Sequence, residues 1–384
     1  MSKKHFIGDV LMLASVPSMI GQFNMNNIKI LRDMGYNVYV ACNFQDRSVC
    51  DETEINDLKK KLANMQIKLI DIVASRHVMD IKAHLHTYKQ LKTLFTKKNF
   101  TFIHCHTPIV SALARMAARK HTKVIYTAHG FHFFTGSPWR NWIFFYPIER
   151  WLSRFTDILI TINKEDYRRA QTFHARKVVY IPGVGLDVDH FHKCDISRME
   201  KRRELNISEN AIVLLSVGEL SARKNHEVII RALSQIKRKD IVYCIAGIGN
   251  LKEEYCSMIH TLGLQTKVLL LGNRTDVDEL CKMSDIFVHP SVREGLGIAA
   301  LEGMASGLPL ICSDINGIKD YAINGVTGYC LAPHDISGFS HAIIKLANDK
   351  ELRHTMGHAA YMASRAFDIR NTEQIMRRVY KTGM

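Results

Sequence analysis

The sequence has no apolar run long enough to cross a bilayer, and no two of its cysteines are spaced C-x-x-C. A membrane-spanning helix needs about 20 consecutive apolar residues, and closely spaced cysteine pairs are typical of zinc sites. The nine cysteines are scattered and lie mostly in apolar segments such as YVAC and LPLIC. We therefore expect a soluble globular protein with reduced, buried thiols and no zinc site.

Acidic residues are few in the first half of the chain. Residues 1–190 contain 27 Lys/Arg against 15 Asp/Glu, a balance of +12, whereas residues 191–384 contain 25 against 22, a balance of +3. A basic half beside a nearly neutral half predicts that the basic half faces an anionic partner. Nucleic acid and an anionic membrane surface both fit at this point.

The N-terminal stretch MSKKHFIGDVLMLASV resembles a signal peptide, because lysines precede an apolar run. Asp9 interrupts that run, however, and PSMIGQF follows where a small-residue cleavage site would be expected. The stretch therefore predicts a first buried strand and a protein that stays in the cytosol.

Short β-branched segments alternate with longer segments of helical periodicity, and the alternation occurs twice. The expected strands are 9–16, 37–43, 67–72, 102–106, 123–129, 157–163 and 177–183, then 212–220, 242–249, 268–272, 286–291, 308–314 and 328–332. Such alternation predicts an α/β protein with two doubly wound, Rossmann-like domains. We expect domains at 1–185 and 186–364, joined within the Gly-, Pro- and Asp-rich residues 181–195, and a lone amphipathic helix within 365–384.

Loops with polar or glycine-rich tips follow four strands of the second half, at 217–225, 246–250, 271–276 and 289–297. In doubly wound sheets, ligands bind beyond the carboxyl ends of the strands. Because these loops would meet at one edge of the second sheet, we expect them to line a ligand-binding cleft.

The segment EGLGIAALE combines two features of a ligand site. Gly295 and Gly297 allow the backbone to approach a ligand, and the following helix directs free N–H groups at it, which favours anions. Glu302, inside that helix, could accept hydrogen bonds from two neighbouring hydroxyls, and Glu294 in the loop could meet another polyol. The alternative, equally weighted on this segment alone, is that both carboxylates only complement the helix dipole.

Arg223 and Lys224 follow the first expected strand of the second domain, at the turn into a helix. Such cations can form charge-assisted hydrogen bonds with a diphosphate. The alternative is a pair of solvated cations, but positive charge is disfavoured at a helix start. The position therefore favours a functional role.

His129 lies at a strand end and precedes Gly130, and His104 and His106 lie at another strand end. A neutral imidazole there could donate a hydrogen bond to a substrate hydroxyl or transfer protons. For any single histidine, a structural role remains the simpler interpretation.

Residues 130–157 hold ten of the 33 aromatic residues, including all three tryptophans, interleaved with Arg140, Arg150 and Arg154. This composition suits a bilayer interface or a groove for a lipid tail. An ordinary helix packed on the first sheet fits equally well. Two DVD triplets, 187–189 and 276–278, do not follow strands, so we expect no divalent-metal site and no cofactor.

The segment PSVREGLGIAALEGMASGLPLICSD resembles the E-x7-E signature of retaining glycosyltransferases of family four, which have the two-domain GT-B fold. HCHTP, YTAHGFHFF, YPIERWLSRFTDILITINKEDY and YIPGVGLD resemble the branch that builds bacterial capsular polysaccharide and exopolysaccharide. The resemblance implies two Rossmann-like domains facing across a cleft, with the C-terminal helix crossing back to the first domain.

The resemblance also implies roles for single residues. Glu302 would bind the ribose and Glu294, with Gly295, Leu296 and Gly297 beside it, the donor sugar. The remaining implied positions are Lys224 and Arg223 on the diphosphate, Asn273 and Arg274 near the uracil, His129 near the transferred sugar, and Gly21 in the first loop near the phosphate. Catalytic roles would fall to His129, Glu294 and Lys224.

One dipeptide departs from the family pattern. Many members have Gly-Arg after the first strand of the second domain, with the arginine on the diphosphate, but this chain has Gly218-Glu219. Arg223 is the candidate to supply the missing charge.

The resemblance implies transfer of a sugar from a nucleotide-sugar, UDP-linked, to an undecaprenyl-diphosphate-linked saccharide, with retention and without metal. The expected partners are that donor, that acceptor and the anionic inner face of the cell membrane, but not nucleic acid. Two alternatives stay open. One is a nucleotide-sugar 2-epimerase on the same architecture, and the other is a non-catalytic, basic nucleic-acid-binding protein, although no recognition-helix motif or aromatic-basic strand pattern is present.

Overall fold

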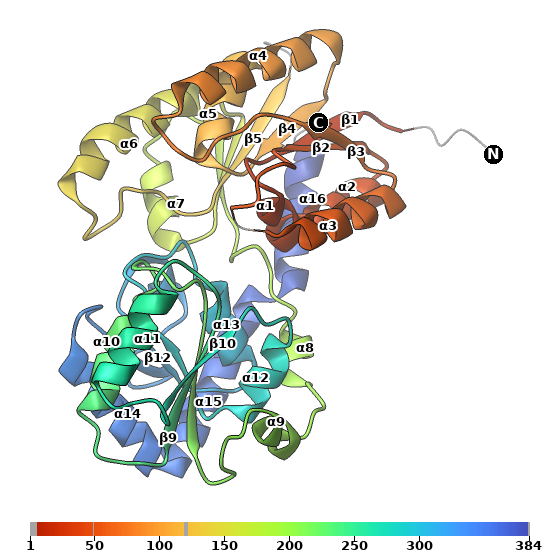
Figure 1. The fold of residues 1–384 in the computed structure, drawn as a ribbon. Coiled ribbons are helices and arrows are strands. Elements are labelled where there is room, and N and C mark those ends of the chain that lie inside the picture. Colours follow the sequence, from red (N-terminus) through yellow and green to blue (C-terminus); the bar gives the residue numbers. More distant parts are fainter. Residues whose placement is uncertain (1–5, 49, 119–121, 383–384) are drawn as a thin grey trace. The chain divides into compact units, whose positions relative to one another are not determined.

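The computed structural model of the protein describes residues 6–48, 50–118 and 122–382 (Figure 1). The chain divides into two compact units, residues 1–184 with 370–384, and residues 185–369. The sequence placed the second limit earlier, at 364. Residues 365–369 stay with the second unit because Leu186 N donates to Phe367 O at 3.0 Å and Ile369 N donates to Leu186 O at 2.8 Å.

The first unit is built on one sheet of seven strands whose neighbours are all parallel. The strands are β1 (Asp9–Leu13), β2 (Asn37–Cys42), β3 (Lys68–Asp71), β4 (Phe102–Cys105), β5 (Lys123–Ala128), β6 (Ile158–Thr161) and β7 (Lys177–Tyr180). Their order in the sheet is β3-β2-β1-β4-β5-β6-β7. The central strands are buried throughout, as expected for a parallel sheet covered on both faces.

Helices connect consecutive strands of the first unit. They are α1 (Pro17–Phe23), α2 (Met25–Asp33), α3 (Glu52–Asn64), α4 (Ile81–Lys97), α5 (Pro108–Ala117), α6 (Trp139–Leu152) and α7 (Lys164–Ala170), with a 3-10 turn, η1 (Ser153–Phe155), after α6. Figure 1 shows α4, α5 and α6 following one another along one side of the unit. The core on this face joins Leu91 and Phe95 of α4 to Ile103 and Tyr126 of the sheet.

The last helix, α16 (Ile369–Thr382), packs on the first unit. The ring of Tyr380 stacks on Phe102 of β4 at 5.6 Å between centroids, and its hydroxyl lies 2.9 Å from His104 Nδ1. Burying an aromatic side chain of this kind stabilises the fold by about 1.5–3 kcal/mol. The expected return of the C-terminal helix to the first domain is therefore confirmed, with residues 383–384 outside the described part of the chain.

The second unit has a sheet of six parallel strands in the order β10-β9-β8-β11-β12-β13. The strands are β8 (Ile212–Val217), β9 (Ile241–Ala246), β10 (Val268–Gly272), β11 (Ile286–His289), β12 (Leu310–Ser313) and β13 (Gly328–Leu331). The helices are α8 (Val188–His192), α9 (Arg198–Glu204), α10 (His226–Ser234), α11 (Lys252–Thr261), α12 (Val277–Met283), α13 (Ile298–Ala305), α14 (Ile336–Asn348) and α15 (Lys350–Ser364), with 3-10 turns η2 (Asn316–Asp320) and η3 (Arg365–Phe367).

Both sheets reverse their strand order at one place, between β1 and β4 in the first and between β8 and β11 in the second. Loops that leave two such strands diverge to opposite faces of the sheet and leave a crevice between them. Every expected strand is present, so the prediction of two doubly wound, Rossmann-like units is confirmed. In each sheet, a ligand site is therefore expected at this reversal of strand order.

Candidate active site

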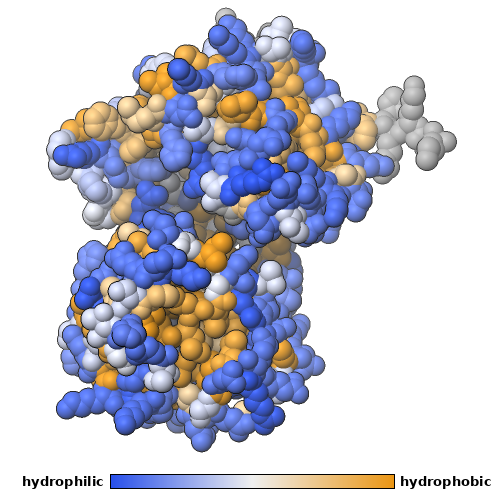
Figure 2. All heavy atoms as spheres, in the orientation of Figure 1, coloured by the Kyte–Doolittle hydropathy of each residue, from blue (hydrophilic) through white to orange (hydrophobic). Residues whose placement is uncertain are grey.

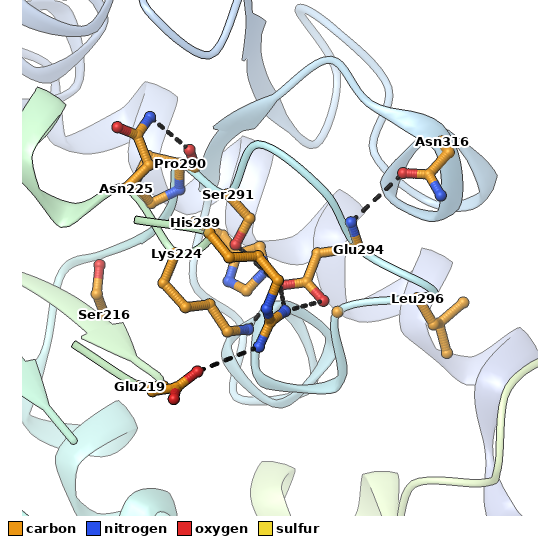
Figure 3. A network of polar contacts seen from close by, with 12 residues as sticks. Ser216, Glu219, Lys224, Asn225, His289, Pro290, Ser291, Glu294, Leu296 and Asn316 are labelled. Atoms are coloured by element: carbon orange, nitrogen blue, oxygen red, sulfur yellow. Dashed lines mark hydrogen bonds and ion pairs between the residues drawn. The ribbon is translucent and has the colours of Figure 1, made fainter. Parts of the chain in front are cut away.

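Glu294 occupies the crevice of the second sheet, in the loop that joins β11 to α13. Its side chain is buried, and one carboxylate oxygen, Oε1, accepts from Lys224 Nζ at 2.6 Å, Ser291 Oγ at 2.8 Å and His289 Nε2 at 3.2 Å. The guanidinium of Arg223 lies 3.4 Å from both carboxylate oxygens. Figure 3 shows Lys224 from the β8 loop, and His289 and Ser291 from the end of β11 and its loop, beside the Glu294 carboxylate.

These neighbours keep the Glu294 carboxylate ionised. Burial raises the pKa of its carboxyl, but Lys224, His289 and Arg223 outweigh burial and hold that pKa well below its ordinary value. The sequence suggested that Glu294 was free to meet a polyol. The structure corrects that view, because Oε1 is saturated by protein donors and only Oε2 retains acceptor capacity.

Lys224 and Arg223 come from the loop after β8, on the other side of the crevice. The aliphatic chain of Lys224 lies against Gly218, where a β-carbon would come within 3.1 Å of it. The amide of Asn225, the next residue, donates to Pro290 O at 3.0 Å and so ties the β8 loop to the β11 loop. These contacts hold the β8 loop, and Lys224 with it, beside the β11 loop.

The Gly218-Glu219 departure has a direct structural consequence. Glu219 is exposed, and its carboxylate lies 3.8 Å from the guanidinium of Arg223. Arg223 therefore stands between Glu219 and Glu294 and is directed into the crevice, where a cation was expected.

Gly297 gives the loop its shape. It ends the loop in the left-handed region, with φ +83°, and an added β-carbon would meet Tyr321 Oη at 2.9 Å and His289 Nε2 at 3.1 Å. The Tyr321 hydroxyl in turn contacts the carbonyls of Leu296 and Gly297, at 2.7 Å and 3.1 Å. The loop from Gly295 to Gly297 is held rigidly at the start of α13.

The pKa of Glu302 is shifted in the opposite direction from that of Glu294. It lies in the second turn of α13, partly buried, and no hydrogen bond or ion pair reaches its carboxylate from the residues that the structure describes. Burial raises the pKa of this carboxyl to about 7, although the charge of Lys224 opposes the rise. A carboxylate kept without a protein partner beside a cation is available to a ligand.

The two remaining donor-binding candidates of the second unit lie beyond β10, at the edge of the sheet. Asn273 is exposed. Arg274, by contrast, donates to Asp276 at 2.8 Å and to Glu204 at 3.0 Å, and these bonds raise the pKa of its guanidinium. The structure gives Arg274 a role in holding α9 and α12 together.

In the first unit, the reversal point brings together side chains that follow β1, β4 and β5. Ser15 and Thr107 are joined by a hydroxyl contact of 2.8 Å, and His106 Nδ1 lies 3.2 Å from His129 Nε2. Burial lowers the pKa of His129 to about 4 and that of His104 to about 3. These histidines are neutral at physiological pH.

Gly21 does not lie in a loop, as the sequence suggested. It lies inside α1, exposed, and a β-carbon there would make only ordinary contacts with Leu58 at 3.6 Å. Pro17 at the helix start allows α1 to begin directly after the β1 loop, which moves Gly21 into the helix.

Sequence reasoning missed the residues that support Glu294. They are His289, Ser291 and Asn316, whose amide oxygen lies 3.4 Å from the Glu294 backbone nitrogen. The signal for the first two was present, since HPS places polar side chains directly after an apolar strand. Asn316 is distant in sequence, and only the fold brings η2 to this loop.

Comparison with known proteins shows to which class of protein this fold and crevice belong. Residues 21–189 match the family described as Glycosyltransferase Family 4, and residues 197–362 match Glycosyl transferases group 1. EpsD of Bacillus subtilis (strain 168), for which a glycosyltransferase activity has been put forward, is 33% identical over 98% of this chain and 97% of its own. The UDP-Gal:alpha-D-GlcNAc-diphosphoundecaprenol alpha-1,3-galactosyltransferase of Escherichia coli is 30% identical over 72% of each chain.

Solved structures agree on the fold. HepE of Anabaena, crystallised with UDP and glucose, superposes with a TM-score of 0.78 at 19% identity, covering 98% of this chain and 100% of that chain. The lipopolysaccharide glycosyltransferase WaaG gives 0.72 at 18% identity, covering 96% and 99%. The protein belongs to the family-four, group 1 glycosyltransferases with the GT-B fold.

Proposed function

We propose that the protein transfers a sugar from a UDP-linked donor to an undecaprenyl-diphosphate-linked saccharide, with retention of the anomeric configuration, in capsular polysaccharide or exopolysaccharide synthesis. The observation that supports this most directly is the crevice between β8 and β11. There Lys224 and Arg223 face the loop that leads into α13, and the Glu302 carboxylate has no hydrogen-bond or ion-pair partner among the described residues.

The second unit would bind the nucleotide part of the donor. A diphosphate needs cations and N–H donors, and Lys224, Arg223 and the start of α13 supply both. Arg293, next to Glu294 and partly buried, adds a third cation, a guanidinium whose pKa is lowered by burial and by Arg223. The Glu302 carboxylate would accept hydrogen bonds from the two ribose hydroxyls.

The chemistry proposed for this site breaks the bond between the anomeric carbon and the diphosphate oxygen, which leaves with the electron pair. The acceptor hydroxyl oxygen forms the new bond on the same face, and its proton passes to the departing phosphate oxygen. The cations of the crevice stabilise the charge that develops on the diphosphate, which is why we propose a reaction without metal. Glu294 acts in this scheme by holding Lys224.

The acceptor part of the proposal rests on the relatives and on the first unit. The Escherichia coli relative bears a name that specifies a diphosphoundecaprenol acceptor. A lipid-linked acceptor requires that the enzyme work at a membrane surface, so the first unit needs a surface that binds lipid.

Helix α6 offers such a surface. Its side chains Trp142, Phe145 and Tyr146 pack against the hydrophobic core of the first unit. The opposite face is exposed and apolar, and consists of Trp139 (67% exposed), Ile143 (58%), Phe144 (61%), Ile148 (53%) and Trp151 (48%). The buried face fits an ordinary helix packed on the first sheet, and the exposed face supports the proposal of a surface that binds lipid.

Exposed arginines support the proposal that this face of α6 binds lipid. Arg140, Arg150 and Arg154 are exposed along and just after α6, and each cation near an anionic bilayer contributes about 1 kcal/mol. Figure 2 shows hydrophobic residues at the left edge of the view, where Figure 1 places α6. Among the described residues no helix is both long and apolar enough to span a bilayer. We propose peripheral binding to the anionic inner face of the membrane.

A panel of nucleotide-sugars tests the donor, scored by the rise in melting temperature that a bound ligand causes. The sugar that stabilises the protein is then incubated with a diphosphoundecaprenol-linked saccharide, and the anomeric configuration of the product is read by NMR. Transfer with retention, undiminished in EDTA, is the expected result. Conversion of the donor alone into an epimer would instead identify an epimerase, and the absence of any stabilising nucleotide-sugar would refute the proposal.

A further inference from the structure

Two histidines of the first unit are linked to each other and to a methionine by consecutive polar contacts. His106 Nε2 lies 2.8 Å from Met12 Sδ, and His106 Nδ1 lies 3.2 Å from His129 Nε2. Met12 is on β1, His106 directly follows β4 and His129 directly follows β5. Burial lowers the pKa of His106 well below its ordinary value, so each of its two contacts involves a neutral ring.

The direction of each hydrogen bond follows from the chemistry of the atoms. A thioether sulfur has no hydrogen and can only accept. His106 therefore donates from Nε2 to Met12, and its single ring proton is used there. Its Nδ1 is then a bare acceptor, and the contact with His129 can form only if His129 donates from Nε2.

We infer that Met12 and His106 are positioning residues that hold His129 in the Nε2-protonated tautomer, so that His129 presents an unprotonated Nδ1 to a substrate hydroxyl. This inference deepens the proposed function and rests on it for the identity of the ligand. It reverses the role expected from the sequence, in which His129 donated a hydrogen bond or transferred a proton. In this geometry His129 accepts.

His104 provides the contrast within the same cluster. Both of its ring nitrogens have partners, Tyr380 Oη at 2.9 Å and Thr127 Oγ1 at 2.8 Å, and its side chain is fully buried. It is a structural histidine that ties α16 to the sheet. His129 is only partly buried, and no partner for its Nδ1 is found within residues 6–48, 50–118 and 122–382. That nitrogen is left to a ligand or to water.

The loop that carries His129 is also held in place. Asp166 on α7 is buried and accepts from the backbone N–H of Phe131 at 3.0 Å. The ring of Phe23 packs 5.8 Å from the His129 ring. With the backbone and the ring both restrained, the tautomer decides what His129 recognises. A bare nitrogen accepts from a hydroxyl and repels a phosphate oxygen, so the recognised group is a hydroxyl and not the diphosphate.

The tautomer can be read without any substrate. In protein labelled with 15N-histidine, long-range 15N–1H correlations at neutral pH distinguish a protonated from a bare ring nitrogen, and His129→Gln assigns the signals. We expect His129 and His106 to be protonated at Nε2 and bare at Nδ1. Protonation of His129 at Nδ1 would overturn the inference, whatever the enzyme transfers.

Met12→Leu removes the sulfur acceptor with little change of volume. Without that acceptor, His106 is free to take the other tautomer, and a measurable fraction of His129 then carries its proton on Nδ1. Met376→Leu is the matched control, because it removes another fully buried thioether from the same unit. An unchanged His129 tautomer in Met12→Leu would contradict the role of Met12, and the wild-type spectrum keeps the inference testable if that variant does not fold.

A second experiment identifies the recognised group. Each sugar hydroxyl of the donor that the enzyme uses is replaced in turn by fluorine, which can accept but cannot donate. At one position we expect kcat/KM to fall about 10-fold in the wild type, the loss of one neutral hydrogen bond, and to fall no further in His129→Ala. Equal fluorine effects in the two proteins at every position would refute hydroxyl donation to His129. If no nucleotide-sugar is used at all, the proposed function fails while the spectra still decide the tautomer.

Discussion

The sheets of the two units share one strand order, apart from a seventh strand in the first, but the side chains at the point where that order reverses differ in charge. In the first, neutral side chains line the loops after β1, β4 and β5, among them Ser15, Thr107 and His129. In the second, Lys224 and Arg223 surround the buried charge of Glu294. The topology places a crevice in both units, and the loop residues decide what each crevice can bind.

The two crevices are suited to different chemical groups. A diphosphate requires cations that are already oriented, and ion pairing with a buried carboxylate orients them. A sugar presents hydroxyls, which neutral acceptors and donors recognise without competing for charge. The first site is therefore suited to a polyol, and the second to an anion.

The largest expected effect comes from removing a cation of the second crevice. Lys224→Met removes the ammonium that would stabilise the leaving diphosphate, and we expect turnover at saturating donor to fall about 10²–10³-fold. The variant also leaves Glu294 buried beside a weaker partner, so thermal stability falls as well.

A double variant separates these two consequences. Lys224→Met with Glu294→Gln removes the unpaired charge and is expected to recover melting temperature but not turnover. Wild-type turnover in the single variant would show that the second crevice does not meet the leaving group.

The next effect concerns donor affinity. Glu302→Gln replaces a carboxylate that would accept from two ribose hydroxyls, and hydrogen bonds to a charged group contribute about 1.5–3 kcal/mol each. We expect calorimetry to show donor affinity about 10–100-fold weaker, with turnover at saturation less affected. An unaltered affinity would remove Glu302 from the ribose site.

The same substitution has a pH signature in stability. The Glu302 carboxyl ionises near 4.5 in an ordinary setting and near 7 in the folded protein. A folded pKa above the unfolded one means that its stabilising contribution is complete below about 4.5 and is lost as pH rises through about 7. That difference corresponds to about 3 kcal/mol.

Glu302→Gln cannot ionise and escapes this loss. We expect the variant to gain unfolding free energy relative to the wild type between about pH 5 and about pH 7, and to keep that gain above it. Urea unfolding of both proteins measures the difference, in which other titrating groups cancel. A difference that does not change with pH would show that the carboxyl is solvated.

The sequence predicted the strands and the helix that returns to the first unit, because periodicity reports which faces are buried. It also predicted Lys224, Glu294 and Glu302 as residues of one crevice. It did not predict that protein donors occupy Oε1 of Glu294, because the contacts with His289 and Ser291 and the approach of Asn316 are made by the fold. Gly21 was misplaced because the resemblance to the family implied a loop there, whereas Pro17 begins a helix in this chain.

A smaller effect tests the lipid side of the comparison. Phe144→Asp places a charge in the middle of the exposed face of α6, and we expect binding to phosphatidylglycerol vesicles in a sedimentation assay to weaken about 10-fold. Ile323→Asp is the control, because Ile323 is exposed to a similar degree, 53%, but belongs to the second unit. Equal losses in both variants would show that α6 is not the surface that binds lipid.

The smallest expected effect separates two arginines that the sequence both assigned to donor binding, Arg223 at the diphosphate and Arg274 near the uracil. Arg223 stands in the crevice with part of its guanidinium open, whereas the guanidinium of Arg274 is taken by Asp276 and Glu204. We expect Arg223→Ala to weaken donor binding several-fold and Arg274→Ala to leave it nearly unchanged while lowering the melting temperature, because only the first removes a cation that a ligand can reach. If Arg274→Ala weakens binding as much as Arg223→Ala, its carboxylate partners release it when the nucleotide binds, and the cationic site extends from the crevice to the edge strand β10.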